Sequence, residues 1–430
     1  MSNNSLDKLY AEFGDNICLY PFFGAFYQTN NVIRKDETGM PNSIRPCSLL
    51  HIDDQHAWDV VDQSIHNSRN TELWKEMRTR MLNGEFHEIY DCKSCSYNEK
   101  TGATSPRVQN NKFLINTLSV DINKEIHKII SNDNTVNDII TLDYYPSNYC
   151  NYACIMCDSG ASSKRHTFEI KHLGHNTKIV VNDADPDFFD VLDRVEIINF
   201  TGGETVLQKQ VFDVMDHLIQ TGRSKDVLIT LLTNGSSSYT EIADRLSQFK
   251  KVIYNVSIDG VNDVGESQRR DSNWKTLDRN ARELFASENI GVVINYVLTA
   301  VNVFSFMEFI DWLLDTDFGP KSLNDELTGS YVNISPVFRY DHLGQSALPP
   351  ELRELALSRL TVGLAKHQTV DTPMGRYCTS LIQRVIDIIN TTPHDPNDLD
   401  KFKQHIKQED LASNKTLIEV VPEWAPYFQS

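Results

Sequence analysis

Residues 144–158 read YYPSNYCNYACIMCD and place three cysteines, Cys150, Cys154 and Cys157, within eight residues. The spacing C-x3-C-x2-C brings three thiolates onto one short segment, where they can bind three corners of a cube-shaped [4Fe–4S] cluster. The fourth iron then has no protein ligand and can bind another molecule. A structural zinc site normally needs four ligands. A disulfide would leave one cysteine over and needs an oxidising compartment. The spacing therefore favours a cluster with an open iron.

This motif resembles the signature of radical S-adenosylmethionine (SAM) enzymes, and Ser147, Asn148 and Asn151 frame the first cysteine as polar residues often do in that family. The resemblance implies that the three cysteines hold the catalytic cluster and that its open iron binds the amino and carboxylate groups of SAM. One electron would then cleave SAM to a 5′-deoxyadenosyl radical, which abstracts a hydrogen atom from a substrate. The residue before the last cysteine is usually aromatic in the family. Here it is Met156, whose apolar side chain would pack against adenine.

Length, charge and cysteine usage limit the classes of function. The 430 residues suffice for two or three domains. The formal net charge of −18 argues against binding to a nucleic-acid backbone, which needs clustered Lys and Arg. No signal peptide is recognisable at the N-terminus, and no run of 18 apolar residues predicts a membrane span. The eight cysteines therefore favour metal or redox roles in the cytoplasm over disulfides.

Six short β-rich runs alternate with amphipathic, helix-length segments in the middle of the chain. The runs are 139–145, 195–200, 227–233, 252–258, 292–298 and 331–336. This alternation predicts an α/β fold with parallel strands, and six units are too few for a closed eight-stranded barrel. The resemblance implies a partial (β/α)6 TIM barrel over residues 139–340.

Polar and glycine-containing turns follow these strands, at the edge where parallel sheets collect their ligands. Each turn alone could be structural, because Asn-Gly and Asp-Gly are common turn dipeptides. The family resemblance assigns them to a SAM pocket and gives the sequence TGGE the role of binding the SAM amino group. Arg269 would meet the SAM carboxylate, although the adjacent Arg270 fits this role equally well. The expected SAM-binding residues are Met156, Gly202, Gly203, Glu204, Asn234, Ser257, Asp259 and Arg269.

A second cysteine group precedes the core and comprises Cys18, Cys47, Cys92 and Cys95. Four thiolates complete an all-cysteine site for zinc or for a full [4Fe–4S] cluster. The segment CLYPFFGAFY (18–27) predicts a strand, and Trp74, Met77 and Met81 predict the apolar face of a helix. The pattern resembles the Twitch and SPASM-type auxiliary-cluster modules of radical SAM enzymes, which more often follow the catalytic core. It implies a β-hairpin and helix domain over residues 1–115, whose four cysteines bind an auxiliary [4Fe–4S] cluster, and a linker over residues 116–138.

The region 341–430 predicts helices at 351–364 and 381–389, a polar break at 394–403 and an apolar tail that packs on the core or serves as a contact surface. Cys378 belongs to neither cysteine group. It is expected to be a buried apolar residue, and the alternatives are a substrate-radical partner or an extra cluster ligand. Arg339, Asp341 and His342 follow the sixth strand as candidate substrate contacts. Asn302 is expected to cap the helix that follows the fifth strand.

The leading hypothesis is a radical SAM enzyme with an N-terminal auxiliary cluster, which needs a reductant such as flavodoxin or ferredoxin. The substrate stays open between a peptide and a small molecule, because Twitch and SPASM-type enzymes act on both. Two alternatives lack SAM chemistry. One is a zinc-stabilised binding protein, and the other is an iron–sulfur electron-transfer protein.

Overall fold

The computed structural model describes residues 5–37, 42–48, 50, 64–100, 104–316, 318, 331–337 and 340–428. Arg339, one of the candidate substrate contacts, lies outside these ranges.

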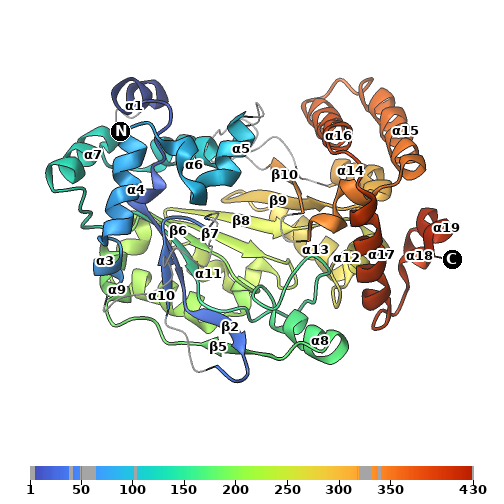
Figure 1. The fold of residues 1–430 in the computed structure, drawn as a ribbon, viewed down its shortest axis with the longest axis horizontal. Helices are drawn as coiled ribbons and strands as arrows, with labels where there is room; N and C mark the ends of the chain where they lie inside the picture. Colours follow the sequence, from blue (N-terminus) through green and yellow to red (C-terminus); the bar gives the residue numbers. More distant parts are fainter. Residues whose placement is uncertain are drawn as a thin grey trace.

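An eight-stranded sheet organises the molecule, with strand order β10-β9-β8-β7-β6-β4-β1-β3 (Figure 1). Its six consecutive parallel strands coincide with the six predicted runs. They are β4 (Thr141–Tyr145), β6 (Ile197–Phe200), β7 (Leu228–Thr233), β8 (Lys251–Ser257), β9 (Ile290–Leu298) and β10 (Tyr331–Pro336). The parallel α/β prediction is therefore confirmed.

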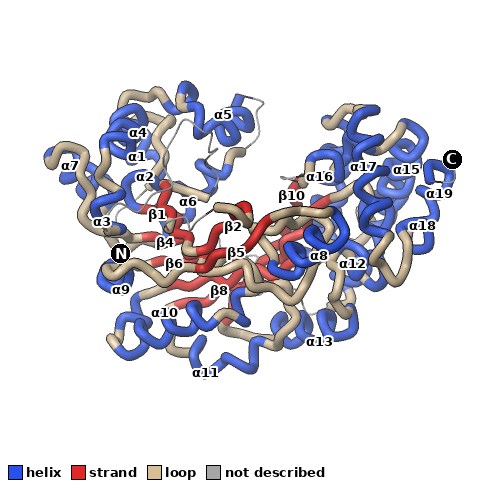
Figure 2. Tube along the Cα trace, turned by 60° about the horizontal axis from the view of Figure 1, so that its bottom comes forward, coloured by secondary structure: helices blue, strands red, loops and turns tan. Residues whose placement is uncertain are grey.

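Helices connect these strands. These helices are α8 (Ser163–Leu173), α9 (Phe188–Val191), α10 (Lys209–Gln220), α11 (Ala243–Leu246), α12 (Asn262–Gln268), α13 (Trp274–Phe285) and α14 (Phe306–Leu314). Of these, α10, α11 and α13 lie along one side of the sheet (Figure 2). In α10 the buried residues Val211, Val214, Met215 and Leu218 recur at the spacing that places them on one side of a helix. Burial of such stripes against the strands fixes each helix on the sheet.

The N-terminal region extends the same sheet. Strand β1 (Gly24–Gln28) pairs in parallel with β4, and β3 (Ser43–Arg45) pairs antiparallel with β1. The predicted strand at 18–27 is wrong in its first half, where Tyr20–Phe23 form the short helix α2. Pro21 stands in the first turn of that helix, where its missing N–H is not needed. Strand β2 (Asn30–Arg34) leaves the sheet and pairs antiparallel with β5 (Thr177–Val181).

Helices pack beside β1 and β4 on the N-terminal side (Figure 2). They are α1 (Leu6–Phe13), α3 (Ile65–Ser68), α4 (Glu72–Leu82), α5 (Lys93–Lys100), α6 (Pro106–Thr117) and α7 (Ile122–Ser131). Trp74, Met77 and Met81 are buried in α4, as predicted. The segment predicted as a linker contains α7, whose Ile122 and Ile126 are buried in the core.

The C-terminal region is helical, as predicted, and gathers at the opposite side of the molecule (Figure 1). Its helices are α15 (Pro350–His367), α16 (Pro373–Thr391), α17 (Pro396–Asp410), α18 (Leu417–Val420) and α19 (Ala425–Phe428). The predicted polar break at 394–403 is wrong, because α17 begins there. Asp395 caps α17 by accepting a hydrogen bond from the backbone N–H of Asn397.

The tail packs on the core, which is one of the two arrangements expected for it. Trp424 is fully buried, lies against Phe402 with ring centroids 4.4 Å apart and the rings tilted by 33°, and donates its indole N–H to the carbonyl of Ala300 at 3.1 Å. Among the helices that the structure describes, none combines the length and the apolar character needed to cross a membrane.

We expect Trp424→Ala to lower the free energy of unfolding by about 3–5 kcal/mol, because it removes a buried aromatic side chain and leaves a cavity. Urea denaturation followed by circular dichroism measures the change. Leu411→Ala is the control, because Leu411 is 74% exposed and its loss should cost no more than about 0.5 kcal/mol. Equal effects of the two variants would contradict the packing of the tail described above.

Candidate functional site

The three cysteines of the 150–157 motif lie on the loop between β4 and α8, which we call the cysteine loop (residues 146–162). The start of α8 holds the first cysteine in place. The backbone N–H of Cys150 donates to Ser163 Oγ at 3.1 Å, and the backbone N–H of Ser163 donates to Asn148 O at 2.8 Å. Asn148 Nδ2 in turn donates to Ser159 O at 2.6 Å across the loop. The loop is therefore closed on itself by polar side chains.

The turn Thr201–Glu204 lies against one side of this loop. Gly203 N donates to Ser147 O at 2.9 Å, and Glu204 N donates to Tyr149 O at 2.7 Å. A Cβ at Gly202, where φ is +116°, would stand 2.5 Å from the carbonyl oxygen of Ser147. A Cβ at Gly203 would overlap the Tyr149 carbonyl. The two glycines are thus required for the close approach of two backbones.

The segment after α12 lies against the other side of the loop. Ala153 N donates to Arg270 O and Ile155 N donates to Gln268 O, both at 3.0 Å. Arg269 Nη1 lies 3.7 Å from Cys154 Sγ, and Arg269 Nη2 lies 2.7 Å from Asp259 Oδ2. The Arg270 side chain instead contacts Glu409 on α17. Of these two adjacent arginines, only Arg269 therefore faces the thiols.

Buried charges surround the thiols. Burial lowers the pKa of Arg269, but Asp259 and the neighbouring Cys154 and Cys157 more than offset this, so the pKa lies above its ordinary value. Burial raises the pKa of Asp259, although Arg269 opposes the rise. Val297 N also donates to Asp259 Oδ1 at 2.7 Å, so a strand fixes the carboxylate. A permanent cation thus stands beside the cysteine loop.

Glu204 and Asn234 link the TGGE turn to the first cysteine. Glu204 is fully buried and accepts hydrogen bonds from Thr233 Oγ1 at 2.5 Å and Asn234 N at 2.6 Å. Asn234 Nδ2 lies 2.8 Å from Asn151 Oδ1 and 3.7 Å from Cys150 Sγ. Burial raises the pKa of Glu204 to about 7, against the opposing effect of these donors. Two of the expected SAM-binding residues are therefore bonded to each other, and Asn234 also contacts the cysteine loop at Asn151.

The thiols themselves have shifted acidities. Burial raises the pKa of Cys150 to about 11. The close interaction of the Cys154 and Cys157 side chains raises the pKa of Cys154 and lowers that of Cys157. Metal ligation requires thiolates, so binding an iron–sulfur cluster would release protons here.

The donor set fits a cluster in its chemistry, because thiolates are the ligands of iron–sulfur centres and Arg269 offsets part of their charge. In the described part of the chain, no three His, Cys, Asp or Glu side chains converge on one point as ligands of a single metal ion. A cube-shaped cluster does not require such convergence, since each thiolate binds a different iron.

The remaining expected residues occupy the same end of the sheet. Met156 is half-buried against the core. Ser257 pairs in register with Asn295, and Asn295 pairs with Asn333, so the three form a polar row across β8, β9 and β10. The expectation that Asn302 caps a helix is wrong. Its amide donates to Asp259 O at 2.9 Å and Val297 O at 2.8 Å, which joins the ends of β8 and β9.

Arg107 joins the segments that carry two members of the second cysteine group, Cys18 and Cys95. Its guanidinium donates to Asp15 O and Ile17 O, next to Cys18, and pairs with Glu99 Oε2 at 2.8 Å on α5, the helix of Cys95. Burial raises the pKa of Cys18 to about 12, and the charge of Cys95 adds to the rise. The charges of Cys47 and Cys18 also raise the pKa of Tyr20, after the larger effect of burial. Segments far apart in the chain thus bring Cys18 near Cys95, and Cys18 and Cys47 near Tyr20.

The other candidate residues lie in the C-terminal region, away from the cysteine loop in the sequence. Cys378 is fully buried in α16, as expected. Asp341 is exposed, and His342 Nε2 lies 3.2 Å from His405 Nδ1 on α17. Sequence reasoning missed Gln268 and Glu409 and gave Thr233 no role of its own. Thr233 directly precedes Asn234 and could have been suspected, whereas no local pattern marks the other two.

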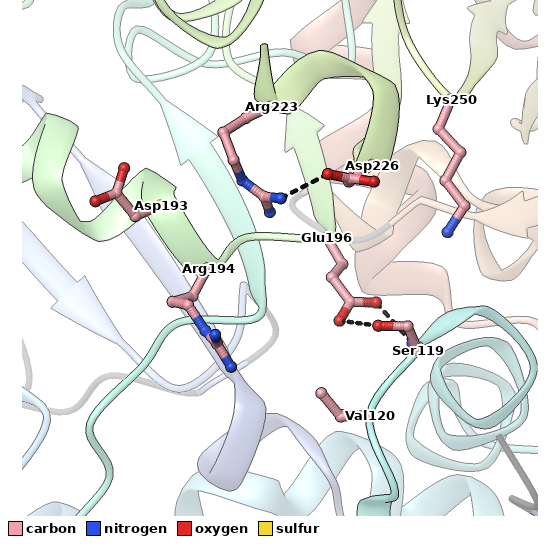
Figure 3. Close-up of a pocket in the computed structure, with 8 residues that line it drawn as sticks. All are labelled: Ser119, Val120, Asp193, Arg194, Glu196, Arg223, Asp226 and Lys250. Carbon is pink, nitrogen blue, oxygen red and sulfur yellow. Dashed lines mark hydrogen bonds and ion pairs between the residues drawn. The ribbon is translucent and has the colours of Figure 1, made fainter. Parts of the chain in front are cut away.

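A hollow of about 250 Å³ lies at the opposite, amino-terminal edge of the strands (Figure 3). Glu196 there accepts hydrogen bonds from the backbone and side chain of Ser119, and Arg223 pairs with Asp226 at 2.8 Å. The lining contains three basic and three acidic side chains, so its net charge selects neither an anionic nor a cationic ligand. Its residues are Ser119, Val120, Asp193, Arg194, Glu196, Arg223, Asp226 and Lys250. This edge of a parallel sheet commonly serves stability, and we assign it no catalytic role.

Residues 144–313 match the family model described as the radical SAM superfamily. This segment begins at the cysteine loop and includes the TGGE turn, Asn234, Asp259 and Arg269. No curated protein matches the chain.

Several solved structures resemble the fold at low similarity. One is anSMEcpe with bound AdoMet, with 18% identity and a TM-score of 0.38 over 52% of this chain and 57% of that chain. Another is Streptococcus suis SuiB bound to precursor peptide SuiA, with 16% identity and a TM-score of 0.36 over 68% of this chain and 60% of that chain. The chain thus spans less than two thirds of the length of either protein.

We expect Gly202→Ala to destabilise the protein more than Gly222→Ala does. Both glycines have positive φ, but only Gly202 has a backbone oxygen in the space of the added Cβ, since no atom lies within 4 Å at Gly222. The shared backbone strain should cost about 1–2 kcal/mol, and the overlap at Gly202 about 1–3 kcal/mol more. Urea denaturation of both variants measures the difference. Equal losses would mean that the TGGE turn does not need its close contact with the loop.

We expect Glu204 to make the protein less stable as pH rises from about 4.5 to about 7. Its folded-state pKa of about 7 exceeds the ordinary value of 4.5, so the folded state binds the proton more tightly within that window. The raised pKa corresponds to a loss of up to ~3 kcal/mol. The free energy of unfolding is measured across this range for metal-free wild type and for Glu204→Gln. The value for wild type should fall relative to that of the variant as pH rises, because Gln has no proton to lose. A constant difference would exclude the raised pKa.

Proposed function

We propose that this chain, whose residues 144–313 match the radical SAM superfamily, is a radical SAM enzyme. The observation that carries the proposal is the arrangement of the cysteine loop. Three thiols lie on it between the Gly-Gly-Glu turn on one side and the buried Asp259–Arg269 pair on the other. Cys150, Cys154 and Cys157 would hold a [4Fe–4S] cluster with one open iron. When bound, that cluster would supply the electron that cleaves SAM to a 5′-deoxyadenosyl radical.

The residues around the loop would orient SAM. Arg269 would hold the SAM carboxylate, since a guanidinium can bind a carboxylate through two parallel hydrogen bonds. Glu204 would accept a hydrogen bond from the SAM ammonium with a lone pair that Thr233 and Asn234 leave free. Met156 would pack against adenine, and Ser257 would line the ribose side. The six parallel strands would form the partial (β/α)6 barrel that exposes this edge to a substrate.

The N-terminal region would be a Twitch-like module over residues 1–115, with Cys18, Cys47, Cys92 and Cys95 around an auxiliary [4Fe–4S] cluster. The proposal is supported by the proximity of Cys18 and Cys95 and by Arg107, which joins their segments. Such a cluster could accept the electron left on an oxidised substrate. The substrate would be a peptide or a small molecule, and flavodoxin or ferredoxin would supply the reducing electron in a cytoplasmic setting.

We expect anaerobically reconstituted wild type to release 5′-deoxyadenosine from SAM when dithionite is added, and Cys154→Ala to lose this activity. Removing a ligand should cost more than the roughly 10–100-fold that removal of an outer-shell partner costs. Liquid chromatography with mass spectrometry measures the product. Cys378→Ala is the matched control, because it removes a buried thiol outside both groups and should keep the activity. A zinc-loaded wild type that leaves SAM intact would overturn the proposal.

We expect Cys95→Ala to halve the iron content, from about eight to about four atoms per chain, because the auxiliary cluster loses a ligand. Iron and acid-labile sulfide analysis after reconstitution measures the change, with Cys378→Ala again as the control. Unchanged iron, or four iron atoms in wild type together with one zinc, would contradict an auxiliary iron–sulfur cluster.

A further inference from the structure

Glu409, on the C-terminal helix α17, is buried between two arginines. Its Oε1 lies 2.5 Å from Arg165 Nη1, and its Oε2 lies 2.8 Å from Arg270 Nη2. Arg270 Nη2 also donates to the Glu409 carbonyl at 2.7 Å and to Ser413 Oγ at 3.1 Å. One carboxylate therefore joins a residue of α8 to a residue that follows α12.

Each arginine is connected to a different part of the cysteine loop. Arg270 accepts the hydrogen bond from Ala153 N at its carbonyl, and it neighbours Arg269, which reaches Cys154. Arg165 N donates to Ser162 Oγ, which in turn donates to Tyr152 O at 2.5 Å. The first connection meets the loop at Ala153, and the second meets it at Ser162 and, through Ser162, at Tyr152.

A second carboxylate closes the network beyond the last cysteine. Arg165 Nε donates to Glu169 Oε1 at 3.1 Å, and Glu169 Oε2 accepts from Ser159 Oγ. The side chains of Arg165, Glu169 and Glu409 are at most 4% exposed, and that of Arg270 is 13% exposed. Two cations thus balance two anions inside the protein.

Phe168 and His405 pack against three of these four charged side chains. The ring of Phe168 lies beside both guanidinium groups, 4.7 Å from that of Arg165 and 4.6 Å from that of Arg270. His405 Nε2 approaches Glu409 Oε1 at 3.4 Å from within α17. Removal of one partner from a buried ion pair leaves an uncompensated charge, which destabilises the groups around it. Loss of the Glu409 charge would therefore act on both connections to the loop.

We propose that Glu409 is a positioning residue of the cysteine loop, which makes the C-terminal helix α17 part of the cluster site. The inference deepens the proposed function and rests on it for the role of the loop. Glu409 does not touch the thiols. It acts through Arg270, which fixes the backbone of Ala153 and places Arg269, and through Arg165, which fixes Ser162 and Glu169.

Hydrogen–deuterium exchange of the full-length chain tests this link without requiring catalysis. In Glu409→Gln, the amides of Ala153 and Ile155 should exchange about tenfold faster or more, because the segment that accepts their hydrogen bonds is released. The amides of the central strand β7 should keep their wild-type rates. Asp400→Asn is the matched control, since it makes the same chemical change at an exposed position of α17, and it should leave both rates unchanged.

Two results would overturn the inference. One is wild-type exchange of Ala153 and Ile155 in Glu409→Gln, and the other is equal acceleration of these amides and of β7, which would indicate a general loss of stability. If Glu409→Gln does not fold, the double variant Glu409→Gln/Arg270→Gln restores the charge balance, with Arg165 and Glu169 still paired. Faster exchange in the loop of this folded variant supports the link, and wild-type exchange overturns it.

A second measurement separates this inference from the proposed function. Reconstituted Glu409→Gln should lose iron to a ferrous chelator several-fold faster than reconstituted wild type and Asp400→Asn do. Failure of the wild type to take up iron would count against the proposed function alone, because the exchange measurement decides the role of Glu409 in the metal-free chain.

Discussion

The cysteine loop has no regular secondary structure, so its buried backbone groups must find partners in other segments. The Thr201–Glu204 turn donates to the carbonyls of Ser147 and Tyr149, and residues 268–270 accept from Ala153 and Ile155. The contact with the Thr201–Glu204 turn depends on Gly202 and Gly203, because any Cβ there would occupy the space of the loop backbone. The geometry of the three thiols therefore depends on a backbone approach that only glycine permits.

Buried charge is the second constraint. The Asp259–Arg269 pair and the Arg165–Glu169–Arg270–Glu409 network lie beside the loop, and each is close to electroneutral. Buried ion pairs of this kind add little net stability, but they are costly to break from one side. They thus favour one arrangement of the loop over its alternatives. The network also explains why a C-terminal region without a recognisable motif packs against the candidate site.

Much of the fold was predictable from the sequence. The six core strands lie within two residues of the predicted runs, because a strand buried on both faces is a continuous apolar segment bounded by turns. The errors occur where local patterns are ambiguous. The apolar run 18–27 does not by itself distinguish a buried helix from a strand, and its first half is α2. The polar run 394–403 contains the start of α17, because Asp395 and Pro396 form an N-terminal capping signal. The run is polar because few residues of α17 face the core.

The sequence by itself determined which residues could carry the chemistry: the C-x3-C-x2-C spacing, the Gly-Gly-Glu turn, and the Asn and Asp that follow successive strands. These are local patterns, so they are readable without a fold. Only the tertiary structure decided which way each side chain points. Arg269 faces the thiols while Arg270 faces α17, although the two are neighbours in the chain. Glu409 reaches the site from 244 residues beyond Arg165, and contacts over such separations arise from packing, which no local pattern records.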